Sequence, residues 1–121
     1  MYNAVNRHMP LKVVFYKTKM NNQPCRDFLL ELDRDERREV GVDIFSVQKG
    51  FPLGLPLCRK IENDLWEIRT KVSDGICRVF FTIDNNNLVL LHGFRKKSQR
   101  TPLSELKTVR DRLNDYKEQN K

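Results

Sequence analysis

The chain has 121 residues, 39% of them hydrophobic and 32% charged, and it carries a net charge of +7 at pH 7. This length and composition predict one ordinary globular domain over residues 1–121, and the longest apolar runs fall well short of the roughly 18–20 residues that cross a bilayer. The N-terminal MYNAVNRHMP lacks the apolar core of a signal peptide, so the sequence favours a cytoplasmic protein over a secreted or membrane-spanning one.

The chain is expected to begin with a strand and a short helix. KVVFY (Lys12–Tyr16) is β-branched and aromatic and is bounded by polar residues, as short strands are. Pro24 is suited to the first turn of a helix, in which Phe28, Leu29 and Leu32 share one face.

A second helix follows directly. Asp33 and Glu36 have the spacing of a capping box, and Gly50 is a suitable end. The residues expected on its apolar side are Val40, Ile44 and Val47, with Phe45 beside them. The two helices are therefore predicted to form an antiparallel hairpin with an acidic outer face.

The second half predicts a rigid loop, three strands and a final helix. GFPLGLPL reads as the loop, and the strands are Asp64–Val72, Ile76–Ile83 and Leu88–Phe94, joined by the turns SDG and DNNN. Thr101 as N-cap and Pro102 in the first turn begin the helix. Its expected apolar stripe is Leu103, Leu106, Val109 (or Arg110), Leu113 and Tyr116.

The predicted order β-α-α-β-β-β-α is an α+β fold, a small antiparallel sheet with the helical hairpin and the C-terminal helix covering one face. Strand alternation assigns to that face Trp66, Ile68, Cys77, Val79, Phe81 and Ile83. The opposite face is expected to be open and to carry Arg69 and Arg78. Taken alone, Arg78 could be a surface charge paired with Glu67; taken with Lys71 and the following basic run, it indicates an anion-binding patch.

Positive charge supports that interpretation, since residues 92–121 hold nine bases and four acids. A basic surface favours an anionic partner, with nucleic acid the first candidate.

Three segments of this region together resemble a known family. LWEIR, GICRVFF and LLHGFRKKSQRTP resemble the HigB-like branch of the RelE/ParE toxin superfamily, and the resemblance extends over about residues 12–117. It implies a RelE-like fold and the toxin of a type II toxin–antitoxin pair, an mRNA interferase that cleaves mRNA in the ribosomal A site and so inhibits translation. The implied partner is a helix-turn-helix antitoxin of the HigA kind, with a toxin–antitoxin heterotetramer as one expected assembly.

The resemblance also implies the catalytic residues of a metal-independent endoribonuclease. Arg69 and Arg78 would hold phosphate oxygens through planar, bidentate donors, and Lys96 or Lys97 would add charge and help to move a proton. In related toxins such basic residues replace the paired histidines of ordinary ribonucleases. The residues expected to bind RNA around them are Lys71, Arg95 and Arg100.

No cofactor and no metal are predicted. Cys25, Cys58 and Cys77 form no CxxC pair and are expected to be reduced, mostly buried thiols. His92 is expected to be a packed, hydrogen-bonded histidine rather than a general base. The aromatic residues expected in the core are Tyr16, Trp66 and Tyr116.

Two other functions remain open at this point. One is a ParE-like inhibitor of DNA gyrase with the same fold and no nuclease chemistry, and the other is a non-enzymatic RNA- or antitoxin-binding module. The joint presence of Arg69, Arg78 and the Lys96–Lys97 pair favours the nuclease, because a gyrase-binding surface would not require these residues.

Overall fold

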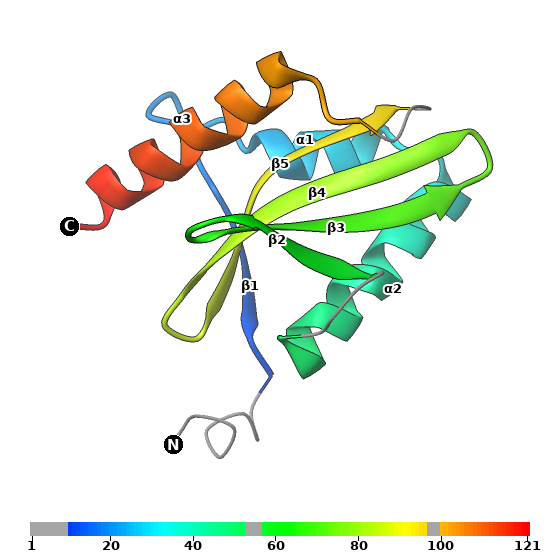
Figure 1. The fold of residues 1–121 in the computed structure, drawn as a ribbon, viewed down its shortest axis with the longest axis horizontal. Coiled ribbons are helices and arrows are strands. Elements are labelled where there is room, and N and C mark those ends of the chain that lie inside the picture. Colours follow the sequence, from blue (N-terminus) through cyan, green and yellow to red (C-terminus); the bar gives the residue numbers. More distant parts are fainter. Residues whose placement is uncertain (1–9, 53–56, 97–99) are drawn as a thin grey trace.

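The computed structural model describes residues 10–52, 57–96 and 100–121, and it confirms the predicted α+β fold (Figure 1). Within these ranges five strands form one sheet and three helices pack against it. The elements are β1 (Lys12–Phe15), α1 (Pro24–Glu31), α2 (Arg34–Gly50), β2 (Cys58–Glu62), β3 (Leu65–Val72), β4 (Gly75–Asp84), β5 (Asn87–Lys96) and α3 (Leu103–Gln119). None of the helices in these ranges is both long and apolar enough to cross a membrane.

The sheet contains one strand more than the sequence predicts. Its order is β1-β5-β4-β3-β2, in which β2 to β5 form an antiparallel meander and β1 pairs in parallel with β5. The additional strand is β2, which forms one edge of the sheet. Its Arg59 and Lys60 are exposed, and charged side chains of this kind are typical of edge strands. Because β2 is short and largely polar, it lacks the apolar run by which the other strands are recognised.

The helical hairpin of α1 and α2 covers one face of the sheet, here called the hairpin face. α2 begins with the predicted capping box, in which Asp33 Oδ1 accepts a hydrogen bond from the Glu36 amide at 2.9 Å. The predicted strand residues are on this face, with Ile68 paired to Val79 in the register. The buried residues of this cluster include Val40, Ile44, Val47, Ile68, Cys77, Val79 and Phe81, with Trp66 and Ile83 partly buried against them. Phe45 is 54% exposed, so its predicted place beside the core is wrong.

Gly93 allows α1 to lie close to β5. A Cβ atom at this position would be 2.4 Å from the Phe28 ring, which is far inside van der Waals contact. The glycine of LLHGF is therefore explained by packing, since the aromatic ring of α1 occupies the space that a side chain would need.

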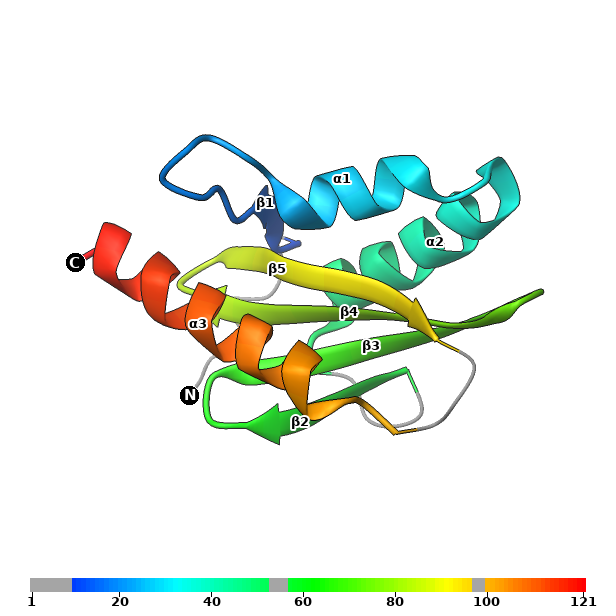
Figure 2. The same ribbon diagram turned by 90° about the horizontal axis from the view of Figure 1, so that it is seen from above.

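The expectation that all helices cover one face is wrong, because α3 packs on the opposite face. Figure 2 shows α3 on the side of the sheet away from α1. Val109 and Leu113 of α3 are buried there, in one cluster with Tyr16, Leu65, Phe80, Val89 and Leu91. Strands β4 and β5 are apolar on both sides, a pattern of sheets covered on both faces, and a single layer of helices would have left this second side exposed.

The start of α3 differs from the prediction. The helix begins at Leu103, Pro102 occupies the N-cap position, and no side chain caps it. Leu103 is 80% exposed and therefore lies outside the apolar stripe, which is made by Leu106, Val109, Leu113 and Tyr116.

The cysteines are free and buried, as the sequence predicts. Burial raises the pKa of the Cys25 thiol to about 12, so it remains protonated at neutral pH.

A histidine between β5 and α3 joins the two elements. Arg112 Nη1 lies 2.5 Å from His92 Nδ1, and because arginine can only donate, Nδ1 accepts. The ring proton is therefore on Nε2, which donates to Glu105 Oε1 at 2.6 Å. His92 is only 9% exposed and both ring nitrogens are engaged, which confirms the packed histidine that the sequence predicts. Burial lowers the pKa of His92 and outweighs the hydrogen bond to Glu105, which raises it; the charge of Arg112 lowers it further.

Replacing Phe81 by alanine should destabilise the protein by about 3–5 kcal/mol, because the ring is fully buried between aromatic neighbours. Its centroid lies 6.0 Å from Trp66 and 5.9 Å from Phe51. Urea unfolding measures the loss. The control is Phe45→Ala on the exposed side of α2, which should change stability by no more than about 0.5 kcal/mol. A loss below about 1 kcal/mol for Phe81→Ala would contradict the assignment of the hairpin face.

The free energy of unfolding should decrease as the pH is lowered, because His92 becomes protonated more readily in the unfolded chain than in the folded protein. The folded protein holds His92 neutral, so below the unfolded pKa of about 6.5 the unfolded chain binds more protons. This contribution is therefore complete above about pH 6.5 and is lost as the pH falls toward the lowered folded pKa. His92→Gln keeps a donor and an acceptor without titrating. Chemical unfolding at pH 7.5 and 5.5 should show a larger loss for the wild type than for His92→Gln, and equal losses would refute the account.

Candidate functional site

A buried carboxylate on β3 binds three arginines. Glu67 is fully buried and lies on the face that α3 packs against, here called the α3 face. Its Oε1 accepts from Arg59 Nε at 3.2 Å and from Arg69 Nε at 2.8 Å, and its Oε2 accepts from Arg78 Nη1 at 3.3 Å. Three guanidinium groups thus share one carboxylate, so the cluster has an excess of positive charge.

Arg78 is on the predicted face, but the expectation that this position is open is wrong. The Arg78 side chain is fully buried. The segment before α3 crosses above it, and Thr101 Oγ1 accepts from Arg78 Nη1 at 3.3 Å. The same hydroxyl lies 3.5 Å from Glu67 Oε2, so Thr101 binds this pair instead of capping α3. Burial, together with the nearby charge of Arg69, lowers the pKa of the Arg78 guanidinium.

An open groove lies above the Glu67 cluster. It is lined by Arg59, Ile61, Arg69, Arg100, Thr101 and Leu106. The three arginines come from β2, β3 and the segment before α3, and the Arg59 and Arg69 side chains are 43% and 23% exposed. No carboxylate is among these lining residues. The groove therefore combines positive charge with donors suited to a phosphate group.

The structure brings most of the predicted site residues to this face. Arg69 and Arg78 are opposite each other in the register, as expected, and Arg100 lines the groove. Lys71 and Lys96 are both in register with Ile76, so they share the α3 face and lie exposed near the end of the sheet.

One predicted residue lies on the other face of the sheet from the groove. Arg95 is in register with Cys77 on the hairpin face, where it forms an ion pair with Glu36 of α2. Lys97 lies outside the described residues, so its predicted role stays a prediction.

Sequence reasoning missed Arg59, which joins the cluster from the unpredicted strand β2. Arg59 pairs in register with Glu67, and the neighbouring Lys60 lies on the hairpin face, 5.7 Å from the Trp66 ring. In CRKIE, Arg59 and Lys60 point to opposite faces of the sheet, as neighbouring residues of a strand do. This alternation assigns Arg59 to the face of Glu67 only once the segment is known to be a strand.

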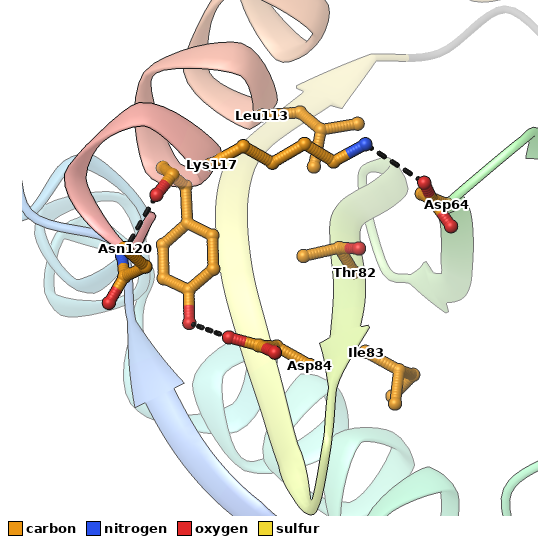
Figure 3. A pocket seen from close by; sticks show the side chains of 8 residues that line it. Asp64, Thr82, Ile83, Asp84, Leu113, Lys117 and Asn120 are labelled. Atoms are coloured by element: carbon orange, nitrogen blue, oxygen red, sulfur yellow. Dashed lines mark hydrogen bonds and ion pairs between the residues drawn. The ribbon is translucent and has the colours of Figure 1, made fainter.

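A second pocket lies near the C-terminal end of α3 (Figure 3). Its lining residues are Asp64, Thr82, Ile83, Asp84, Leu113, Tyr116, Lys117 and Asn120. Their polar groups already bind one another, since Tyr116 donates to Asp84 at 2.7 Å and Lys117 to Asp64 at 2.8 Å. These contacts hold α3 to the ends of β3 and β4, and they leave the groove as the better candidate for binding an anion.

Removing the charge of Glu67 should destabilise the protein strongly. Glu67→Gln keeps the shape of the side chain but leaves Arg78 buried without its carboxylate, and breaking such a buried pair typically costs about 3–5 kcal/mol. Glu62→Gln is the matched control, because the Glu62–Arg110 pair is exposed and solvent screens the attraction between its charges. Denaturant unfolding compares the two variants. Equal, small losses would mean that the cluster does not depend on this carboxylate.

Comparison with known proteins places the chain in a family. Residues 27–114 match the family described as phage-derived protein Gp49-like (DUF891), and this range holds strands β2 to β5 together with the Glu67 cluster. No curated protein matches the chain significantly. The match covers most of the chain, so the protein belongs to the Gp49-like family, a toxin-like family of the RelE/HigB type found in toxin–antitoxin systems.

Proposed function

We propose that this protein is the toxin of a type II toxin–antitoxin system and acts as a ribosome-dependent mRNA endonuclease of the HigB kind. The observation that supports this function best is the groove in which Arg59, Arg69 and Arg100 gather above the buried Glu67. Membership of the Gp49-like family supports the same function, and so does the resemblance of LWEIR, GICRVFF and LLHGFRKKSQRTP to HigB-like toxins. The proposed partners are mRNA in the ribosomal A site and a helix-turn-helix antitoxin of the HigA kind.

The arginines would stabilise the transition state of RNA cleavage. In this reaction the 2′-oxygen attacks the adjacent phosphorus, the bond to the 5′-oxygen breaks, and negative charge increases on the two non-bridging oxygens. Arg59 and Arg69 lie at the edge of the groove where they can bind such oxygens. Because Glu67 holds both through Nε, their guanidinium groups are in place before the substrate arrives, which is the arrangement that lowers the barrier most.

Proton transfer needs further groups. The 2′-hydroxyl must lose a proton and the leaving 5′-oxygen must gain one. Lys96 is exposed on the α3 face and is proposed to protonate the leaving 5′-oxygen, with Lys97 as the second lysine proposed for this step. The proton of the 2′-hydroxyl is proposed to pass to water. His92 is not assigned a role in catalysis, because Arg112 and Glu105 already occupy its two nitrogens.

Arg78 is proposed to act as a positioning residue. Its fully buried side chain binds Glu67 Oε2, which leaves Oε1 for Arg59 and Arg69. Its effect on cleavage would then pass through these two neighbours.

An aromatic ring on the same face favours RNA over a simple phosphate. Phe94 is half-buried, is in register with Arg78, and stacks on Phe80 with ring centroids 6.1 Å apart and planes 9° apart. Aromatic rings near a positively charged groove are a platform for the bases of single-stranded nucleic acids, and Phe94 is separated from the groove-lining Arg69 by one strand, β4.

The two neighbouring cations of β2 provide a matched test of the groove. Arg59→Ala and Arg69→Ala should each reduce single-turnover cleavage of mRNA on programmed ribosomes by roughly a hundredfold or more, the scale for losing a preorganised donor. Lys60→Ala removes the same charge from the adjacent position on the hairpin face and should cleave at close to the wild-type rate. Circular dichroism and thermal unfolding would confirm that the variants are folded.

Two results would contradict the proposal. Wild-type cleavage by Arg59→Ala and Arg69→Ala would exclude this groove as the nuclease site. Growth arrest on expression without new mRNA 5′ ends on ribosomes would exclude the nuclease itself and favour an inhibitor of DNA gyrase.

A further inference from the structure

The outer side of α2 carries a continuous stripe of exposed residues that contains no acid, so the acidic outer face predicted from the sequence is wrong for this side of α2. The exposed Asp35 and Glu39 lie beside the stripe. At 100° per residue its six positions fall within an arc of about 100° on the helix surface. This α2 stripe consists of Arg34, Arg38, Gly41, Val42, Phe45 and Lys49. It lies on the hairpin side of the sheet, away from the basic groove.

The centre of the α2 stripe is apolar without serving the core. Val42 is 56% and Phe45 54% exposed, whereas the buried side of α2 is completed by other residues. A Cβ atom added to Gly41 would meet nothing within 4 Å, so the helix backbone is open to close approach at this point. Small and apolar residues at successive turns of an exposed helix are the surface against which a second helix packs.

The two ends of the α2 stripe are cationic. Arg34 and Arg38 lie toward the N-terminal end, and Lys49 lies at the C-terminal end with its Nζ 5.2 Å from the Phe45 ring. None of the ion pairs among the described residues includes these three side chains. Arg34 is also unfavourably placed for the helix, because the N-terminal turn already carries partial positive charge. These charges therefore contribute little to the fold and are available to an acidic partner.

We propose that the α2 stripe docks an amphipathic helix of a partner protein, with a seam of small or aliphatic residues flanked at both ends by carboxylates. Val42 and Phe45 would pack against the seam beside Gly41, while the carboxylates would pair with the cations at each end. Because the stripe and the basic groove lie on opposite sides of the sheet, this partner would leave the groove uncovered. The proposal does not depend on nuclease activity.

Synthetic helical peptides test the chemistry of this surface. The first peptide has a Leu/Ala seam with Glu flanks, the second the same seam with Lys flanks, and the third Glu flanks with a Ser/Gln seam. Fluorescence anisotropy with the full chain should show binding of the first peptide alone, and the amide resonances that it shifts should be those of residues 34–49.

Charge reversal on α2 sharpens the test. The double variant Arg38→Glu/Lys49→Glu should bind the Glu-flanked peptide at least about tenfold more weakly and should bind the Lys-flanked one instead. Phe45→Ser should weaken binding of the first peptide, whereas Leu103→Ser, at an apolar residue exposed elsewhere, should not. Absence of binding, equal binding of the third peptide, or resonance shifts centred on Arg59 and Arg69 would each overturn the proposal, and none of these readouts uses mRNA cleavage.

Discussion

The ionic contact between Glu67 and three arginines connects the fold to the site. A buried carboxylate is tolerated only when opposite charges and hydrogen bonds replace water, and here β2, β3 and β4 each supply an arginine. Thr101 adds a contact from the segment that leads into α3. Side chains from an edge strand, two central strands and the segment before α3 thus all contact one carboxylate. The positive groove above it is a direct result of that convergence.

On the α3 face of the sheet, one end is packed against α3 and the other end carries the charged side chains of the groove. Near one end of the α3 face, Leu65, Phe80 and Val89 are sealed by the helix, and the tyrosine and lysine contacts near the C-terminus of α3 hold it there. Toward the other end α3 has not yet begun, so charged side chains occupy the same face and remain accessible in part. The point at which α3 starts therefore determines where the groove lies.

The sequence predicted those parts of the fold that have strong local signals. The capping box of Asp33 and Glu36, the parity of Trp66 to Ile83 and the pairing of Arg69 with Arg78 all follow from spacing alone. The strand β2 was missed because a polar edge strand is stabilised by its neighbour and not by its own composition.

The exposure of Arg78 was predicted wrongly for a related reason. Its place on the sheet follows from alternation, but its burial depends on where α3 packs, which is a tertiary property. The apolar residues on the second side of β4 and β5 were the available signal. A sheet face that contains an arginine can therefore still be covered by a helix, provided that a carboxylate such as Glu67 pairs with the arginine.

The parallel pairing of β1 with β5 joins segments that lie far apart in the sequence. Lys12 to Phe15 are in register with Asn87 to Leu90, and Tyr16, just after β1, donates a hydrogen bond to Asp115 of α3. Pairing across so many residues is intrinsically slow, because the long intervening chain loses entropy when it closes. During synthesis the first strand must therefore wait until β5 and α3 have left the ribosomal exit tunnel. Arg100 and Thr101 emerge between these two elements, so the groove can be completed only after nearly the entire chain has been translated.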